Sequence, residues 1–228
     1  MSNESYWDKT AETWEKTIQS KQNPHYHYYH TMDLLVADLL RREGVHNALE
    51  LGCGTARCAI NVLQTHDNTQ VHIHGIDISP RMIEIGQVNL LTANLTDRIT
   101  LQVGDVANLP YPANMFDVAF SRGAVLSYTQ EPRQMLDHVH RVLRDTGVIG
   151  LDVITRPQAG NDSYVGKITP STSIDSREII YREWYTKENL QVTRAYRVES
   201  DTPLHTELKA LFDDLPTHLP DFSEDIDA

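Results

Sequence analysis

The sequence predicts an α/β protein: a doubly wound, mostly parallel, Rossmann-like sheet with helices on both faces and an antiparallel C-terminal hairpin. Three observations support this fold class. Short apolar runs alternate with stretches of helical periodicity from residue 45 to residue 154. The runs are almost continuously apolar, as strands buried on both faces are. Glycines or acidic residues follow several of them, which is typical of the ligand-binding edge of such a sheet.

Residues 1–44 are expected to form a helical, aromatic-rich N-terminal lid. The pattern predicts a short helix over 10–18, which Asn23-Pro24 ends. A second helix is expected at about 31–43, with Gly44 at the position of a C-terminal cap.

Residues 45–200 are expected to form the ligand-binding domain. Ser79-Pro80 is a strong helix start, because serine caps and proline suits the first helical position. Asp152 is the one polar residue in the last of the apolar runs. The expected strands are 47–51, 70–77, 99–105, 116–120 and 148–154, and the expected helices between them are 55–64, 80–93 and 132–144.

The pattern changes after Arg156. Residues 157–176 are expected to be a loop, and 178–186 with 190–198 an antiparallel hairpin. A short helical piece is expected at 206–212. Residues 201–228 are predicted to be an acidic, disordered C-terminal tail.

Composition narrows the class of partner. The chain has 228 residues, with 20 basic and 32 acidic side chains and a net charge of −12. A surface of that sign disfavours nucleic acid and anionic membranes. The polar start and the lack of any run near the ~18 apolar residues of a membrane span predict a cytoplasmic protein. We expect a monomer or homodimer.

The candidate ligand site surrounds Glu50, Gly52 and Gly54, between the first strand and its helix. Two glycines let the backbone turn sharply and let a ligand approach closely. Asp77 follows the second strand, where an acid commonly accepts hydrogen bonds from a ribose diol. Asp105 ends the third strand.

Three points favour S-adenosylmethionine over a dinucleotide. The dinucleotide fingerprint needs a third glycine, and Arg57 stands there instead. The carboxylate of Glu50 suits a cationic amine or sulfonium better than a diphosphate. Asp105 and the backbone of Val106 offer an acceptor and a donor to an adenine edge.

The ordered motifs resemble class I S-adenosylmethionine-dependent methyltransferases of the small-molecule type. Residues 49–56 resemble their first motif, 75–82 their ribose-binding motif, and 104–110 their adenine-binding segment. Residues 116–120 and 143–148 are similar to their fourth strand and the turn into their fifth. The resemblance implies this cofactor-binding set: Glu50, Gly52, Cys53, Gly54, Asp77, Ile78, Met82, Asp105, Val106, Ser121 and Arg122.

Two departures from the family pattern stand out. Ala56 occupies a position where many members have a third glycine. The Gly-Phe step that usually opens the last strand does not follow residues 206–212. The predicted hairpin therefore either completes the parallel sheet, which we favour, or forms an inserted lid.

Aromatic residues are the candidates for the substrate wall, because rings suit planar or cationic ligands. Methyl transfer depends mainly on aligning the acceptor with the methyl group, and a general base helps only when the acceptor must lose a proton. The sequence therefore shows no decisive catalytic residue. The catalytic candidates are His27, His30 and Tyr128. The substrate-binding candidates are Tyr6, Trp14, Tyr28, Trp184 and Tyr185.

No metal site is expected, because the histidine spacing at 25, 27 and 30 fits no common ligand pattern. Cys53 and Cys58 are interpreted as packing residues. The predicted function is methyl transfer from S-adenosylmethionine to an N, O, S or C atom of a small molecule. The alternatives are a catalytically inactive partner subunit and a nicotinamide-dependent reductase. The absence of a Tyr-x-x-x-Lys pair disfavours the reductase.

Overall fold

The structure is a computed structural model that divides into two compact units, residues 1–152 and 153–228. It describes residues 3–18, 20–21, 23, 26–65 and 71–152 of the first unit, and the backbone of three strands in the second. No helix among the described residues is long and apolar enough to cross a membrane.

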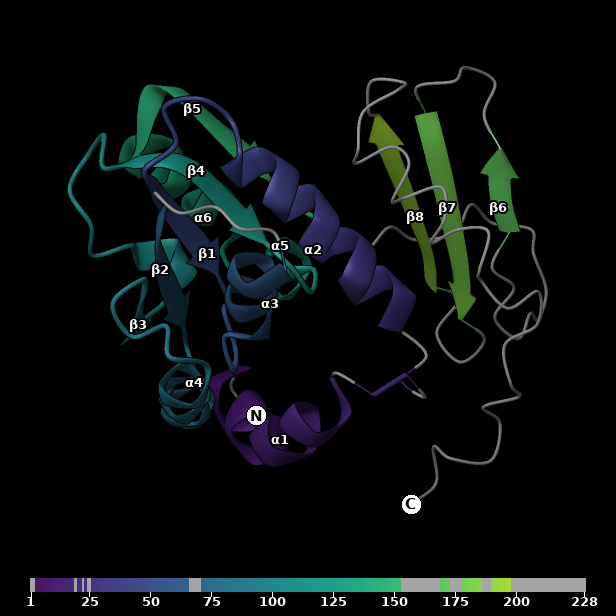
Figure 1. The fold of residues 1–228 in the computed structure, drawn as a ribbon, viewed down its shortest axis with the longest axis horizontal. Coiled ribbons are helices and arrows are strands. Elements are labelled where there is room, and N and C mark those ends of the chain that lie inside the picture. Colours follow the sequence, from purple (N-terminus) through teal and green to yellow (C-terminus); the bar gives the residue numbers. More distant parts are fainter. Residues whose placement is uncertain are drawn as a thin grey trace. The chain divides into compact units, whose positions relative to one another are not determined.

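The first unit is built on a five-stranded parallel sheet in the order β3-β2-β1-β4-β5 (Figure 1). The order reverses between β1 and β4, which places a ligand-binding edge there. This confirms the predicted fold class. The strands are β1 (Asn47–Leu51), β2 (His72–Asp77), β3 (Ile99–Val103), β4 (Phe116–Ser121) and β5 (Leu143–Gly150).

Helices cover both faces of this sheet. On one face, α2 (Tyr26–Leu40), α3 (Arg57–Thr65) and α4 (Pro80–Ala93) pack on β1 and β2 around Ile73 and Ala48. On the other face, η1 (Val106–Asn108) and α6 (Pro132–Val142) enclose a second apolar cluster with Phe116.

The predicted start of α4 is confirmed in atomic detail. Ser79 accepts a hydrogen bond from the backbone N–H of Met82 at 3.1 Å, and Pro80 occupies the first helical position. Asn94 closes the helix in the left-handed conformation. This cap fixes the chain directly after Asp77.

The N-terminal helices begin earlier than the sequence pattern predicts. α1 spans Asn3–Thr17, and α2 begins at Tyr26. In α1, Trp7, Ala11, Trp14 and Ile18 recur at helical spacing, so aromatic side chains supply its inner face. The first turn of α2 consists of tyrosines and histidines, so the apolar pattern of the sequence did not predict that it is helical.

β5 differs from the predicted strand 148–154. Leu143 pairs with Phe116, but Val148 pairs with Val118, so the intervening residues form a bulge inside the strand. The turn residues that we expected before the strand are these bulged residues. Residues 153 and 154 lie outside the described part of the chain.

In the second unit, β7 (Glu178–Tyr185) and β8 (Leu190–Arg197) form the predicted antiparallel hairpin. β7 also pairs with β6 (Thr169–Thr172) in a three-stranded sheet, and β6 lies in the predicted loop. The expectation that the hairpin completes the parallel sheet stays a prediction. The predicted helical piece and tail lie outside the described residues.

Candidate active site

A cavity of about 270 Å³ lies in the first unit, at the carboxyl ends of β1, β2 and β4. Ten of the eleven predicted cofactor contacts line it, from Glu50 in β1 to Arg122 after β4. Its described lining consists of Glu4, Trp7, Trp14, Glu50, Gly52, Cys53, Gly54, Thr55, Arg57, Asp77, Ile78, Met82, Asp105, Val106, Ala107, Arg122, Gly123, Val125, Tyr128, Thr129, Gln130 and Glu131.

The glycine turn needs glycine at Gly52, for two reasons. Its φ is +63°, a left-handed value that side chains disfavour. A Cβ there would also lie 2.4 Å from a methyl carbon of Val125, which begins α5 (Val125–Tyr128). The close approach of α5 to this turn brings the segment after β4 over the cavity.

Asp77 holds the turn from the neighbouring strand. One of its carboxylate oxygens accepts the backbone N–H of Gly54 at 2.8 Å, and the other accepts that of Ser79 at 2.9 Å. Only 8% of the residue is exposed, and this burial raises the pKa of its carboxyl group. Asp77 therefore stabilises the glycine turn through hydrogen bonds and also lines the cavity.

Glu50 carries an unsatisfied buried oxygen. The residue is 2% exposed, and its Oε2 has no hydrogen-bond partner among the described residues. Burial raises the pKa of this carboxyl group to about 8, although the positive charge of Arg122 opposes the rise. The Thr55 hydroxyl, in the same cavity wall, is likewise buried without a partner in the described part of the chain. Such atoms imply a polar ligand group.

Arg122 is a buried cation that α2 helps to hold. Its Nη1 lies 2.9 Å from the Asp33 carboxylate, and the two side chains are 7% and 5% exposed. Asp33 also accepts a hydrogen bond from Asn61 at 2.9 Å. The guanidinium lies over the Tyr29 ring, 5.1 Å from its centroid.

The opposite end of the cavity is less polar. Ile78 and Met82 follow β2, and Val106 opens η1. Asp105 caps η1, where one of its oxygens accepts the backbone N–H of Ala107 at 2.8 Å. This end offers apolar surface with an exposed carboxylate beside it.

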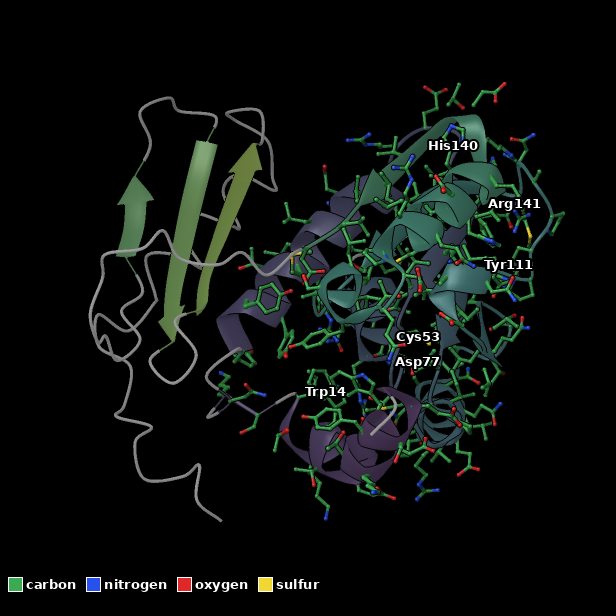
Figure 2. The ribbon with its side chains drawn as sticks, turned by 180° about the vertical axis from the view of Figure 1, so that it is seen from behind. Trp14, Cys53, Asp77, Tyr111, His140 and Arg141 are labelled. Carbon is green, nitrogen blue, oxygen red and sulfur yellow. The ribbon has the colours of Figure 1, made fainter. Side chains whose placement is uncertain are left out.

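α1 covers the cavity through Trp7 and Trp14, whose rings pack edge to face at 6.1 Å. Figure 2 shows Trp14 on α1, close to Asp77 and Cys53. The next face of α1 carries three acids that bind the helix to its neighbours. Asp8 contacts Ser79, Glu12 contacts Arg81 at 2.7 Å, and Glu15 contacts Arg57.

Several predicted residues lie elsewhere. Ser121 is fully buried and donates to Asp152, so it does not line the cavity, and Tyr28 also donates to Asp152. Tyr6 is 52% exposed and lies outside the lining. His30 faces a second cavity of about 230 Å³ between α2 and α3.

Tyr128, a predicted catalytic candidate, does line the main cavity, and its ring meets Trp7 edge to face at 5.8 Å. The side chains of His27, Trp184 and Tyr185 lie outside the described residues. Sequence reasoning missed Trp7 and Thr55 as lining residues. The signal for Trp7 was its seven-residue spacing from Trp14, two helical turns along one face.

Comparisons with known proteins show similarity to methyltransferases. Residues 48–147 match a family described as a methyltransferase domain. A demethylmenaquinone methyltransferase of Symbiobacterium thermophilum is 32% identical over 145 residues, which are 62% of this chain and 54% of that protein. The chain spans about half the length of the curated relatives it matches.

Two solved structures are also similar. A putative S-adenosyl-L-methionine-dependent methyltransferase from Methanococcus maripaludis has 25% identity and a TM-score of 0.54, and the match covers 67% of each chain. The 4+2 cyclase SpnF has 30% identity and a TM-score of 0.52, over 57% of this chain and 47% of that one. Residues 48–147 therefore match the methyltransferase-domain family, and the similar structures include an S-adenosyl-L-methionine-dependent methyltransferase.

The residues present fit S-adenosylmethionine, the methyl donor of this family. The orphaned Oε2 of Glu50 is a buried acceptor that an ammonium group would satisfy. At Gly54 a Cβ would meet only Trp14 and Met82, at 3.8 and 3.9 Å, so the cavity reaches the backbone of the turn there. The lining contains five acids and two arginines, and both arginines are already ion-paired, so the cavity favours a cationic ligand.

Proposed function

We propose that this protein transfers a methyl group from S-adenosylmethionine to a small molecule. The observation that carries the proposal is the buried Oε2 of Glu50, which has no hydrogen-bond partner among the described residues and belongs to a side chain that lines the same cavity as the glycine turn and Asp77. A buried carboxylate oxygen without a partner is costly, so its retention favours a ligand that supplies the missing donor.

In this proposal the residues divide the cofactor among them. Glu50 and the turn at Gly52 and Gly54 bind the methionine part, and Asp77 accepts from the ribose hydroxyls. The apolar end near Met82 takes the adenine, with Asp105 at its edge. When bound, S-adenosylmethionine supplies an electrophilic methyl group on a sulfonium. The protein then aligns the acceptor and excludes water.

The acceptor would enter at the end of the cavity where Trp7 and Tyr128 meet. Two exposed residues with carboxylate side chains, Glu4 and Glu131, also line the cavity. Rings beside carboxylates suit a planar acceptor or one that carries a positive charge. We therefore propose a planar or basic small molecule as the methyl acceptor, with its reacting atom left open among N, O, S and C.

Calorimetric titration with S-adenosylmethionine, followed by incubation of the labelled cofactor with a metabolite panel, tests the proposal. We expect binding and transfer of label to at least one acceptor. Binding without transfer to any acceptor would favour the partner-subunit role over methyl transfer. Absence of binding to S-adenosylmethionine and to its product S-adenosylhomocysteine would overturn the cofactor assignment.

A further inference from the structure

Asp152 is a buried carboxylate that the proposed chemistry does not use. It is 9% exposed, it follows β5, and it is not among the residues that line the cavity. Its Oδ2 accepts the backbone N–H groups of Gly123 at 2.9 Å and Ala124 at 2.6 Å. Its Oδ1 accepts the Ser121 hydroxyl at 2.9 Å, and the Tyr28 hydroxyl donates to Oδ2.

The loop that Asp152 binds has an unfavourable backbone conformation. Gly123 has φ of +113°, and Ala124 has φ of +59° in the left-handed region, where a Cβ is disfavoured. Two consecutive N–H groups converge on one carboxylate oxygen, and hydrogen bonds to a carboxylate are stronger than neutral ones. The loop therefore depends on Asp152 for its shape.

This loop sets two walls of the cavity. Val125 follows it immediately and closes over Gly52, while Arg122 precedes it and pairs with Asp33. Asp33 and Tyr28 both belong to α2, so α2 contacts the loop at Arg122 and at the carboxylate beneath it. Asp33 fixes the Arg122 guanidinium, and Asp152 fixes the backbone one residue further along.

We infer that Asp152 is a positioning residue for the cofactor site, and that it acts as a hydrogen-bond acceptor and not as a base. It shapes the β4–α5 loop, which places Val125 and Arg122 against the glycine turn. Four donors already surround its carboxylate, and it has no place in the cavity wall. The inference rests on the proposed function, because the site that it shapes is the proposed cofactor site.

Two substitutions separate positioning from base catalysis. Asp152→Asn keeps an oxygen for the two loop N–H groups, and its amide can donate to the Ser121 oxygen. We expect its Kd for S-adenosylhomocysteine to stay within about threefold of wild type. Asp152→Ala leaves the loop donors unpaired, and we expect Kd to rise roughly tenfold or more.

Asp117→Ala is the matched control. Asp117 also accepts two backbone N–H groups, those of His46 and Asn47, both at 2.9 Å, but at the start of β4, away from the cavity. We expect this variant to lower the melting temperature without changing Kd. A rise in Kd equal to that of Asp152→Ala would show that general destabilisation explains the effect, and it would overturn the inference.

Hydrogen exchange followed by mass spectrometry gives a readout that needs no ligand. We expect faster exchange over residues 121–128 in Asp152→Ala and near wild-type exchange in Asp152→Asn. Equal acceleration in both variants, or in neither, would overturn the inference. A base would instead show unchanged Kd with loss of turnover in both variants. If the wild-type protein binds no cofactor, the proposed function fails, while the exchange experiment still decides the role of Asp152.

Discussion

The floor and the roof of the cavity are held by different forces. The floor, Glu50 with Gly52, Gly54 and Asp77, belongs to the ends of β1 and β2, where backbone hydrogen bonds of a buried sheet fix it. The roof is α1, which contacts the rest of the unit mainly through side chains. Arg81 and Glu12, which help to hold it, are 46% and 51% exposed.

This difference separates a rigid binding surface from a cover of lower stability. Exposed ion pairs each contribute little, about 0.2–1 kcal/mol, and salt weakens them. The cavity volume of about 270 Å³ is just below the ~300–1,000 Å³ of small-molecule sites. The floor is therefore expected to contribute more to the stability and the affinity of the site than the roof.

Asp77→Ala should have the largest effect, because it breaks the floor. It removes the proposed ribose acceptor and leaves the N–H groups of Gly54 and Ser79 without their partner. We expect a loss of stability of about 2 kcal/mol or more and a rise in Kd for S-adenosylmethionine of roughly 100-fold. Calorimetry measures the Kd, and chemical denaturation measures the stability. Unchanged affinity would contradict the ribose assignment, and the exposed Asp97→Ala is the control.

Deleting residues 1–20 removes the roof alone. The cut must end before α2, because Tyr28 and Tyr29 are buried and Tyr28 binds Asp152. We expect the far-ultraviolet spectrum of the sheet to persist, while affinity for S-adenosylmethionine falls roughly tenfold with the loss of the aromatic cover. A truncated protein with full affinity and turnover would contradict the role of α1.

A milder variant keeps the roof but loosens it. Glu12→Gln breaks only the exposed pair with Arg81, so we expect a change in stability below about 0.5 kcal/mol and no change in Kd. It therefore serves as the control for the deletion.

Glu50→Gln should separate stability from binding within the floor. The unfolded carboxyl group ionises near pH 4.5, but the folded one ionises only at about pH 8. The wild-type protein should therefore lose free energy of unfolding as pH rises between these values, by up to about 1.4 kcal/mol per unit. The glutamine variant has no charge to bury, so it should lack this decline and be the more stable protein at pH 8.

The same substitution should weaken binding, because a neutral amide attracts an ammonium group less than a carboxylate does. We expect affinity for S-adenosylmethionine to fall roughly tenfold at pH 8. Denaturation curves at pH 5 and pH 8, together with calorimetry, measure both effects. A variant that is less stable at pH 8 yet binds as tightly as wild type would contradict the role given to Glu50.

The floor was predictable from the sequence because its signals are local. Strand, glycine turn and helix are consecutive, and Asp77 lies two residues before the helix cap Ser79, so the sheet order alone brings the turn and Asp77 together. The comparison with the methyltransferase family agrees over the same segment.

The roof was less predictable because its contacts are distant in sequence. Asp8 and Ser79 are 71 residues apart, and no periodicity in a single sequence reveals such a pair. Ser121 was placed in the site because it follows a strand that ends there. Its neighbour Arg122 lines the cavity, but the Ser121 hydroxyl is buried and donates to Asp152.

Ala56→Gly is expected to have the smallest effect on the stability of the floor. Ala56 stands where the resemblance of residues 49–56 to the methyltransferase motif implies a third glycine, and its φ is +63° with the side chain fully buried. Ala56→Gly relieves a left-handed alanine, worth about 1 kcal/mol, but it loses a buried methyl group worth about 0.8 kcal/mol. We expect these effects to offset, with a net change within about 0.5 kcal/mol and unchanged Kd. A loss above about 2 kcal/mol in chemical denaturation would contradict this balance and would mean that removal of the methyl group leaves a cavity.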